Sequence, residues 1–305
     1  MEESITETGI DTTQDSYDSS PLELQLEQSE LSEPINSFVA GSRALLIDEK
    51  GREAFVKLRE GGQSHTHAGY ILHDEILGKP DGYLYTTNTG AHFVALIPGL
   101  DDTVLKMPRG AQVIYPKDLG AILIQADIFP GAKVLEAGVG SGAMSMALVR
   151  AGAHVTGYEI REDFADRAVK NVAMLARRGS HGSYRILIRD IYEGISETGY
   201  DRVILDLPEP WLVSPHLPGA LVAGGRVCAY QTSINQVAEF KHSLVRMGFS
   251  FVKTVEVLER GWYIQGRAVR PDHRMVAHTG FWTSARYVPA LKRPADPKDV
   301  QHEVG

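Results

Sequence analysis

The sequence predicts a doubly wound, Rossmann-like α/β domain that follows a small all-β domain. From about residue 117 onward, apolar strand-like runs alternate with amphipathic helix-like runs, which is typical of a largely parallel sheet covered by helices. Short strand-like runs around turn residues precede this region. Four segments are therefore expected: a disordered acidic tail over 1–37, the β domain over 38–110, the α/β domain over 111–290 and a flexible tail over 291–305.

The composition is that of a globular protein with one unusual end. Hydrophobic residues make up 43% of the chain and charged residues 23%, which is enough for a sizeable core. Residues 1–37 contain ten acidic and no basic residues, so disorder is expected there, with at most a transient helix over 22–31. The rest of the chain is nearly neutral, with 29 acidic and 31 basic residues, which permits nucleic-acid binding without demonstrating it.

The sequence shows no features of a membrane protein, a secreted protein or a metal-binding protein. No run of about 18 apolar residues predicts a membrane span, and the acidic N-terminus does not resemble a secretory signal. We expect no membrane association and a cytoplasmic location. The single cysteine, Cys228, excludes an intramolecular disulfide and a cysteine-built zinc site. His65, His67 and His73 lack acidic co-ligands and helical spacing, so no metal is expected.

The β domain is predicted from two hairpin patterns. Strand-like runs over 43–47 and 54–58 flank an Asp-Glu-Lys-Gly turn. A second pair, over 83–85 and 92–96, flanks an Asn-Thr-Gly turn. These four runs indicate a small antiparallel sheet.

The α/β domain is predicted from seven strand-like runs and four helix-like ones. The strands are expected over 134–136, 154–159, 185–188, 202–205, 225–230, 251–257 and 281–288. The helices are expected over 118–128, with Asp118 as its cap, over 143–151, over 162–178, and around Val237, Phe240, Leu244 and Met247. The last two strands would close the sheet with an antiparallel edge.

A glycine loop joins the first of these strands to a helix. Gly138, Gly140 and Gly142 let the backbone turn tightly and approach a ligand without a Cβ in the way. NAD enzymes use a similar loop, but two details favour S-adenosylmethionine here. Ala143 stands where a dinucleotide motif places its third glycine, and Glu136 suits an ammonium group better than a pyrophosphate.

Acidic residues end the next two strands. Glu159 lies 21 residues after Gly138, where a carboxylate can accept hydrogen bonds from ribose hydroxyls. The alternative interpretation of Glu159, as an exposed glutamate at a strand end, is weaker because the glycine loop lies at the right distance in the sequence. Asp190 would lie near an adenine ring and accept from its amino group, although a turn-forming aspartate is nearly as well supported.

The fourth strand leads into Asp-Leu-Pro-Glu-Pro-Trp at residues 206–211. Parallel sheets bind ligands at the carboxyl ends of their strands, so this acid, prolines and aromatic would form a stiff lip beside the methyl donor. A rigid loop without chemistry is an equally good interpretation of this one feature. Trp211, Trp262 and Trp282 are expected in core or interface packing.

Several motifs in order resemble one known family. They are 69–80 (GYILHDEILGKP), 105–110 (LKMPRG), 114–118 (IYPKD), the glycine loop, 206–211, Arg270-Pro271 and His278-Thr279-Gly280. Between about residues 40 and 288 the chain resembles the bacterial and archaeal tRNA (adenine-58-N1)-methyltransferases, most closely their actinobacterial members. The resemblance implies a class I methyltransferase fold, S-adenosylmethionine as cofactor, tRNA as partner and a homotetramer.

The resemblance also implies a mechanism and a set of site residues. N1 of the target adenine attacks the sulfonium methyl in line, while Asp206 accepts a hydrogen bond from the N6 amino group and balances the developing charge. Tyr115 and Tyr230 match aromatic positions that line the pocket for the flipped-out base, and His278 matches a position near the acceptor pocket, without a role in proton transfer. Cofactor contacts carry over to Gly140, Ser141, Gly142, Ala143, Glu159, Asp190 and Asp206.

One departure and three alternatives remain at this point. The family often continues with Leu-Pro-Asn after the residue matching Tyr230, whereas this chain has Gln231-Thr232-Ser233. An NAD-dependent oxidoreductase would use the same fold, and a methyltransferase with a protein or small-molecule acceptor would use the same cofactor. A non-catalytic binding subunit would require a damaged glycine loop, and this loop is intact.

Overall fold

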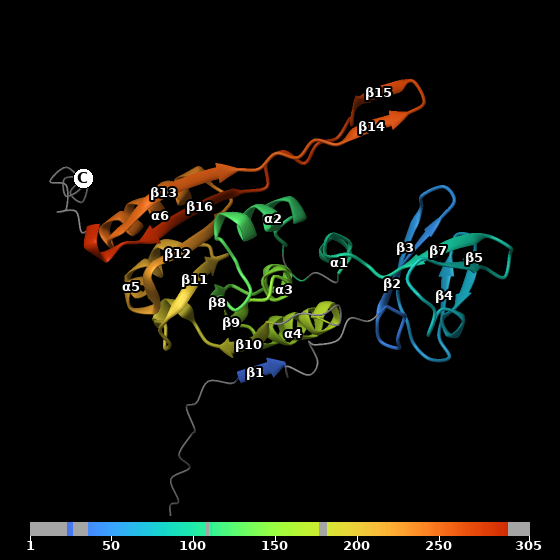
Figure 1. Cartoon of the computed structure of the whole chain (residues 1–305), viewed down its shortest axis with the longest axis horizontal. Coiled ribbons are helices and arrows are strands. Elements are labelled where there is room, and N and C mark those ends of the chain that lie inside the picture. The colour runs from blue at the N-terminus through green and yellow to red at the C-terminus, as the bar shows by residue number, and fades with distance from the viewer. Residues whose placement is uncertain (1–22, 27–35, 108–109, 111, 177–181, 292–305) are drawn as a thin grey trace, which may run out of the picture.

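In the computed structural model, residues 23–26, 36–107, 110, 112–176 and 182–291 are described. Within them the larger sheet has eight strands in the order β1-β10-β9-β8-β11-β12-β16-β13. These strands are β1 (Glu23–Leu26), β8 (Lys133–Ala137), β9 (His154–Glu159), β10 (Ser183–Ile188), β11 (Tyr200–Leu205), β12 (Leu221–Gln231), β13 (Phe249–Glu256) and β16 (Phe281–Tyr287). Figure 1 shows this domain beside the smaller β domain.

The strand directions confirm the predicted doubly wound sheet. The pairs β10–β9, β9–β8, β8–β11 and β11–β12 are parallel, and β16 runs antiparallel to both β12 and β13. The antiparallel C-terminal edge predicted from the last two strand-like runs is therefore present. Every predicted strand of this domain lies within one of these strands or overlaps it.

Helices cover both faces of the sheet. They are α2 (Pro116–Gln125), α3 (Ala143–Arg150) and α4 (Glu162–Ala176) on one face, and α5 (Leu217–Ala220) and α6 (Ile234–Arg246) on the other. Side chains alternate along a strand, so Val134 of β8 packs in the first core and Leu135 in the second. The helix predicted to reach residue 178 is described to Ala176; residues 177–181 lie outside the described residues.

The prediction that Asp118 caps α2 is wrong. The helix begins earlier, with Pro116 at its first position and Tyr115 at the cap. Proline is well suited to a first helical position because its missing N–H would be unpaired there anyway. Asp118 is fully buried, and its carboxylate contacts Lys117 and Thr279 instead of the helix backbone.

The expected disorder of residues 1–37, and the transient helix over 22–31, are wrong for Glu23–Leu26. This segment forms β1 and pairs antiparallel with β10. Its alternation of polar and apolar residues turns Leu24 toward the core and leaves Glu23 and Gln25 exposed. The edge of β10 offers unpaired backbone groups that such a strand satisfies. Residues 1–22 and 27–35 lie outside the described residues.

The β domain contains the two predicted hairpins in a sheet of order β3-β2-β7-β6. Its strands are β2 (Arg43–Asp48), β3 (Glu53–Lys57), β6 (Tyr83–Thr86) and β7 (His92–Leu96), with an unpredicted hairpin of β4 (Gln63–Thr66) and β5 (Gly69–Leu72) beside them. Phe38, Leu46, Ile71 and Phe93 are among the residues of its own apolar core.

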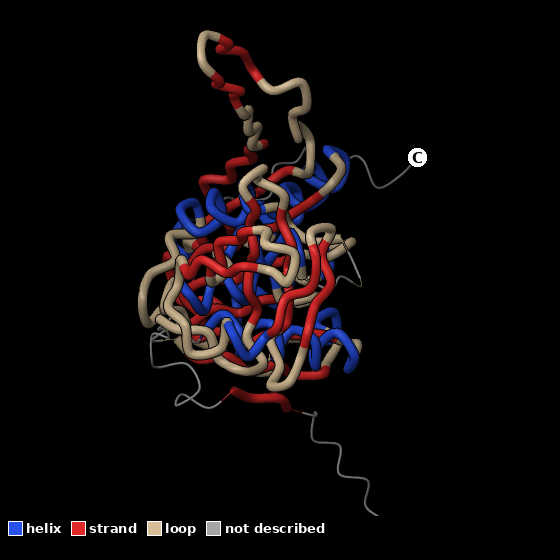
Figure 2. Tube along the Cα trace, turned by 90° about the vertical axis from the view of Figure 1, so that its right-hand side faces the viewer, coloured by secondary structure: helices blue, strands red, loops and turns tan. Residues whose placement is uncertain are grey.

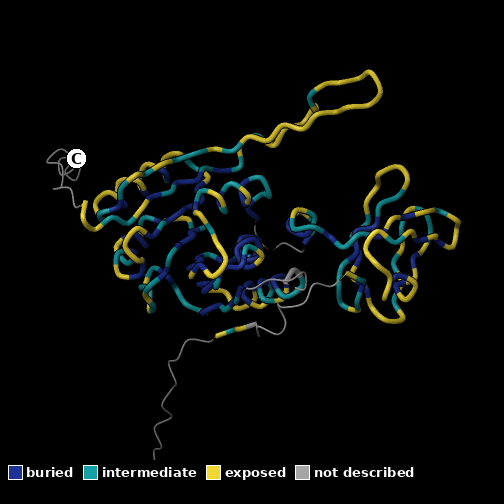
Figure 3. The backbone as a smooth tube through the Cα atoms, in the orientation of Figure 1, coloured by how far each residue is buried: buried dark blue, intermediate teal, exposed yellow. Residues whose placement is uncertain are grey.

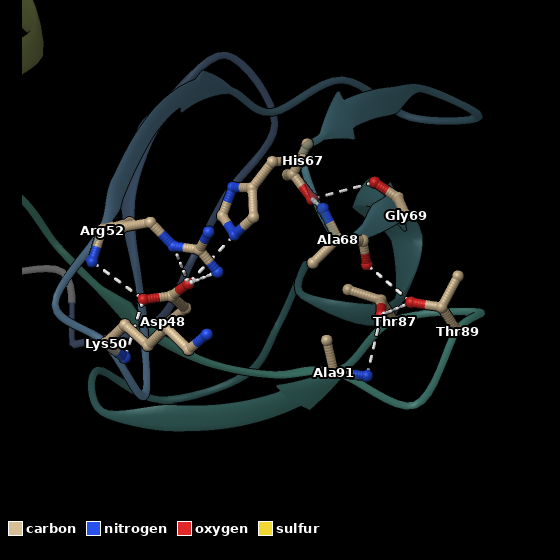
Figure 4. Close-up of polar contacts among 10 residues, drawn as sticks. Asp48, Lys50, Arg52, His67, Ala68, Gly69, Thr87, Thr89 and Ala91 are labelled. Carbon is tan, nitrogen blue, oxygen red and sulfur yellow. Dashed lines mark hydrogen bonds and ion pairs between the residues drawn. The ribbon is translucent and has the colours of Figure 1, made fainter.

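The first hairpin of the β domain is held by one aspartate (Figure 4). Asp48 Oδ1 accepts hydrogen bonds from the backbone N–H groups of Lys50 at 2.9 Å and Arg52 at 2.8 Å. Its Oδ2 contacts Arg52 Nε at 2.7 Å and His67 Nε2 at 3.0 Å. Desolvation opposes the charge of this carboxylate, but these hydrogen bonds outweigh it and lower the pKa of Asp48 to about 2. His67 thus has a structural partner in the turn.

Part of the segment just before the predicted boundary at residue 110 packs with the larger domain. The unpredicted helix α1 (Leu100–Lys106) follows the last strand of the β domain. Val104 and Met107 pack in the core of the α/β domain, together with residues of α2 and α3. Val104 and Met107, which the sequence assigns to the β domain, therefore contribute to the core of the larger domain.

A hairpin between β13 and β16 extends away from the α/β body. Strands β14 (Trp262–Gln265) and β15 (Ala268–Pro271) pair with each other and with no other described strand. Figures 1 and 2 show this arm projecting from the body, and Figure 3 shows its exposed surface. Trp262, predicted to pack in a core or interface, is 58% exposed, whereas Trp282 is buried.

No helix among the described residues is both long and apolar enough to cross a membrane. The predicted flexible tail over 291–305 is described at Leu291 alone, and residues 292–305 lie outside the described residues.

The core of the β domain predicts a contrast between two leucines. Leu46 is fully buried and Leu84 is 58% exposed. Leu46→Ala should lower the free energy of unfolding by about 2–5 kcal/mol, because it leaves a cavity in a packed core. Leu84→Ala should change it by less than about 0.5 kcal/mol. Urea unfolding followed by circular dichroism measures both, and equal losses would contradict the assignment of this core.

Candidate active site

A cavity of about 680 Å³ opens at the carboxyl ends of the parallel strands. Gly138 follows β8, Glu159 ends β9, Asp190 follows β10 and Asp206 follows β11. The cavity is lined by Gln112, Gly138, Gly140, Tyr158, Glu159, Ile160, Arg161, Phe164, Arg189, Asp190, Ile191, Tyr192, Asp206, Leu207, Pro208, Tyr230, Gln231, Thr232 and Gln236. Its size is in the range of small-molecule and cofactor sites.

The glycine loop needs its glycines for two separate reasons. A Cβ at Gly138 would lie 2.6 Å from the carbonyl oxygen of Asp206, so only glycine lets the ends of β8 and β11 approach this closely. Gly140 and Gly142 have φ values of +56° and +82°, a left-handed conformation that other residues rarely adopt. A Cβ at Gly142 would also lie 3.0 Å from the Cα of Ala168 in α4.

Glu159 braces this loop through backbone hydrogen bonds. Its Oε2 accepts from the N–H of Gly140 at 2.9 Å, and its Oε1 accepts from the N–H groups of Ile160 at 2.9 Å and Arg161 at 3.1 Å. Because three backbone donors hold it, the carboxylate has a defined position on the cavity wall. It connects the glycine loop to the segment that follows β9.

Asp206 lines the same cavity without such support. Its carboxylate is half-buried and accepts no hydrogen bond from the described residues, although its backbone N–H donates to the carbonyl of Ala137 at 2.6 Å. Burial without a compensating donor raises the pKa of Asp206 to about 7. The group is therefore available to a ligand, and its charge changes near neutral pH.

Tyr230 is held in place from two sides. Its hydroxyl donates to the carbonyl oxygen of Thr279, and its ring lies 5.0 Å from that of Trp282. A Cβ at Gly280 would overlap the Tyr230 ring, so glycine is required there for this arrangement. Burial raises the pKa of Tyr230 to about 12, which keeps the phenol neutral.

Asp190 caps a turn and also lies on the cavity wall, so the contact with an adenine ring stays a prediction. It lies on the cavity wall, and its Oδ1 accepts a hydrogen bond from the N–H of Tyr192 at 2.9 Å, which caps a short 3₁₀ helix. The turn fixes one carboxylate oxygen.

Three of the cofactor contacts implied by the family resemblance do not line the cavity. Ser141, Gly142 and Ala143 are not among the lining residues. Ser141 and Ala143 are buried, and the Ser141 carbonyl accepts from Asn171 Nδ2 at 2.9 Å. Their position supports the loop from the side of α3 and α4.

Tyr115 and His278 also lie outside the cavity wall. Tyr115 precedes α2, and its carbonyl accepts from the N–H groups of Asp118 and Leu119 at 2.9 and 3.0 Å. His278 is exposed, with its Nδ1 2.6 Å from Glu256 Oε1. The hydrogen bond with Glu256 raises the pKa of His278. Of the predicted base-pocket residues, the structure brings only Tyr230 together with Asp206.

Glu136 does not face the cavity, so its position does not support the argument that its charge attracts an ammonium group. Its side chain is buried, and its Oε2 accepts from Ser145 Oγ at 2.7 Å. Tyr184 in turn donates to Ser145 at 2.9 Å. Desolvation raises the pKa of Glu136 to about 8, so the carboxyl is largely protonated at pH 7.

A buried ion pair that sequence reasoning missed lies beneath Tyr230. Lys117 Nζ donates to Asp118 Oδ1 at 3.0 Å, to the carbonyl of Val257 at 2.7 Å and to Thr279 Oγ1 at 2.6 Å. Thr279 Oγ1 also donates to Asp118 Oδ2 at 2.7 Å. This cluster fastens the start of α2 to the segment whose carbonyl holds Tyr230. The Pro-Lys-Asp motif could have indicated this cluster, but the partners of Lys117 in Val257 and Thr279 are 140 or more residues away in the sequence.

Other wall residues were also missed. Ile160, Arg161 and Phe164 follow Glu159 closely, so their proximity in sequence could have indicated them. Arg161 lies over the Phe164 ring at 3.8 Å from its centroid. Gln112 and Gln236 come from segments with no recognisable motif and reach the cavity through tertiary folding.

Family models match both parts of the chain. The model described as tRNA methyltransferase complex GCD14 subunit matches residues 91–280, and the model described as TrmI-like N-terminal matches residues 37–84. The first match begins before α1 and ends at Gly280, next to the Tyr230 ring. The second lies within the β domain.

Curated relatives are similar over nearly their whole length. The tRNA (adenine(58)-N(1))-methyltransferase TrmI of Thermus thermophilus is 33% identical over 246 residues, covering 79% of this chain and 95% of that protein. The tRNA (adenine(57)-N(1)/adenine(58)-N(1))-methyltransferase TrmI of Methanocaldococcus jannaschii is 32% identical over 286 residues, covering 85% and 98%.

Two solved structures share the fold. A protein of Thermotoga maritima described as a SAM-dependent O-methyltransferase aligns with a TM-score of 0.76 and 35% identity, covering 83% of this chain and 95% of that one. The tRNA (m1A58) methyltransferase TrmI of Aquifex aeolicus aligns with a TM-score of 0.70 and 27% identity, covering 83% and 99%. These alignments confirm the predicted class I methyltransferase fold. With its glycine loop, strand-end acids and Asp206 lip in one cavity, the chain belongs to the GCD14/TrmI family of S-adenosylmethionine-dependent tRNA methyltransferases.

Proposed function

We propose that this enzyme methylates N1 of adenine 58 in the T-loop of tRNA with S-adenosylmethionine as methyl donor. The observation that carries the proposal is the Asp206 carboxylate, which lines a cavity shared with the glycine loop and Tyr230 and accepts no hydrogen bond from the described residues. The names of the TrmI relatives from Thermus thermophilus and Methanocaldococcus jannaschii support the same reaction.

The residues present fit S-adenosylmethionine. Gly138 and Gly140 leave backbone open on the cavity wall, and Glu159 presents a fixed carboxylate suited to ribose hydroxyls. Asp190 and Ile160 would flank the adenine ring of the cofactor, while Ser141, Gly142 and Ala143 would hold the loop from behind. When bound, S-adenosylmethionine supplies an electrophilic methyl group on its sulfonium.

Asp206 and Tyr230 would receive the acceptor base. N1 of adenine has a free lone pair, so no strong base is needed to expose it. A carboxylate at Asp206 would accept a hydrogen bond from the N6 amino group and stabilise the positive charge that develops on the ring. The fixed Tyr230 ring would offer an apolar wall to a flipped-out base. We retain Tyr115 and His278 as proposed substrate contacts outside the cavity wall.

The alternatives account for fewer features. An oxidoreductase leaves the Asp206 lip without a role, and none of the named relatives above is one. The description of the Thermotoga maritima protein would favour an oxygen acceptor. Relatives named for adenine N1 and the TrmI-like β domain favour tRNA instead.

We further propose a homotetramer located in the cytoplasm, where its tRNA substrate is found. The exposed arm supports self-association because Trp262, Ile264 and Val269 are 58%, 70% and 61% exposed. Large apolar side chains gathered on one projection are typical of an interaction surface.

The reaction predicts a single modified nucleoside. Incubation with labelled S-adenosylmethionine and an unmodified tRNA transcript should yield 1-methyladenosine on nuclease digestion and mass spectrometry. A transcript with guanosine at position 58 is the matched control and should remain unlabelled. Recovery of a methylated oxygen or of a different base would reject the proposal.

The brace at Glu159 predicts a loss of cofactor affinity. Glu159→Gln keeps the shape but removes the charge and turns one acceptor into a donor facing backbone N–H groups. The Kd for S-adenosylmethionine, measured by isothermal titration calorimetry, should rise about tenfold or more. Glu162→Gln, at the start of α4 and exposed, is the control and should bind normally. An unchanged Kd in Glu159→Gln would remove this residue from the cofactor site.

The raised pKa of Asp206 predicts a pH-dependent rate. Below about pH 7 the carboxyl is increasingly protonated and neutral, and above it the carboxylate can accept from N6. In the free enzyme kcat/KM should therefore rise between about pH 6 and pH 8. Asp206→Asn should lose about 10²–10³ in kcat and this ascending limb with it. A retained limb in the variant would assign the titration to another group.

A further inference from the structure

The charged cluster beneath Tyr230 is buried and fully hydrogen-bonded. The side chain of Lys117 is 3% exposed and that of Asp118 is 0% exposed. An ammonium group carries three donors, and Lys117 directs them to the Asp118 carboxylate, the Thr279 hydroxyl and the Val257 carbonyl. Such a network is rigid, but a buried ion pair adds little net stability because both charges lose their water. The positions that the cluster fixes are therefore a better explanation for it than stability.

Thr279 connects this cluster to Tyr230. Its hydroxyl accepts from Lys117 Nζ at 2.6 Å and donates to Asp118 Oδ2 at 2.7 Å. Its backbone carbonyl accepts from the Tyr230 hydroxyl. Gly280 comes next, and a Cβ there would overlap the Tyr230 ring. A shift of the backbone at 279–280 would therefore change both the hydrogen bond of the phenol and the space beside its ring.

The segment that carries Thr279 lies at the root of the arm. The chain leaves the sheet at Glu256, where β13 ends, and returns at Phe281, where β16 begins, and these two residues are in register. Lys117 contacts Val257 on the outgoing side and Thr279 on the returning side. Because α2 itself packs in the core of the α/β domain, the cluster ties the root of the arm to a fixed element.

The Tyr230 phenol is near both the cluster and the carboxylate proposed to receive the base. Burial is the main cause that raises the pKa of Tyr230 to about 12, and the nearby charges of Asp118 and Asp206 contribute in the same direction. Tyr230 and Asp206 also line the same cavity. The ring is thus linked on one side to the cluster and exposed on the other to the acceptor end of the site.

We propose that the Thr279 hydroxyl, held by Lys117 and Asp118, is a positioning group that places the Tyr230 ring for the acceptor base. The inference rests on the proposed function, since it assumes that Tyr230 contacts that base. Thr279 and Lys117 do not touch the substrate and act on the rate through Tyr230. Methyl transfer requires close alignment, and a misplacement of about 1 Å can lower a rate about 10²-fold.

The first test removes the hydroxyl of Thr279 and then restores it in the full-length protein. Thr279→Val keeps the shape of the side chain and the backbone carbonyl, and should lower kcat/KM for an unmodified tRNA transcript about tenfold. The Kd for S-adenosylmethionine should stay unchanged, because Glu159 and the glycine loop are held by other contacts. Thr279→Ser retains the hydroxyl and should recover most of the wild-type kcat/KM.

Thr254→Val is the matched control. It removes a hydroxyl that lies 3.0 Å from Thr283 Oγ1 in the same sheet, without a link to Tyr230. Its kcat/KM should equal that of the wild type.

A double-mutant cycle tests the route through Tyr230. Tyr230→Phe keeps the ring and removes the hydroxyl that donates to the Thr279 carbonyl. Tyr230→Phe and Thr279→Val should each lower kcat/KM about tenfold, and the double variant should be no slower than either single variant. Independent effects would instead multiply to about 10²-fold.

The possible failures are separable. If wild type forms no 1-methyladenosine, the proposed function is wrong and the positioning role is rejected with it. If wild type forms this product, full activity in Thr279→Val, an equal loss in Thr279→Ser or multiplied losses in the double variant reject the positioning role alone. An equal loss in Thr254→Val, or a changed Kd for S-adenosylmethionine in Thr279→Val, would reveal a general disturbance of the fold and likewise overturn it.

Discussion

The close approach of two strand ends is the constraint on which the site depends. Gly138 follows β8 and Asp206 follows the neighbouring strand β11, and any side chain at Gly138 would collide with the Asp206 carbonyl. This contact joins the cofactor loop to the acceptor lip in one cavity. The absence of a Cβ at Gly138 therefore keeps the loop and the lip close enough for two ligands to meet in one cavity.

Three acidic side chains near this contact behave differently because their surroundings differ. Glu159 accepts three backbone hydrogen bonds, Asp206 accepts none from the described residues, and Glu136 is buried beside Ser145. The carboxylate of Glu159 is thus held in place, the pKa of Asp206 is raised to about 7 and that of Glu136 to about 8. Solvation and hydrogen bonding, rather than residue type, decide which carboxyl group is fixed in place and which pKa is raised.

The strongly periodic parts of the fold could be predicted from the sequence, and the weakly periodic ones could not. Buried parallel strands contain continuous apolar runs, and the run Val203-Ile204-Leu205 is why the end of β11 was predicted correctly. The strand β1 has four residues and forms only because β10 leaves an open edge, so nothing local distinguishes it from the acidic tail. The arm of β14 and β15 has exposed side chains on both strands and therefore lacks the pattern of a packed sheet.

The sequence by itself determined the succession of strands along the chain, the glycine loop and the acids that end the strands. Each of these features depends on residues that are neighbours in the sequence. Only the tertiary structure decided which side chains share a cavity. It brought Tyr230 into the same cavity as Asp206, left Tyr115 and His278 outside the cavity wall, and joined Lys117 to Thr279. Such contacts depend on strand pairing and burial across more than a hundred residues, and no local pattern records them.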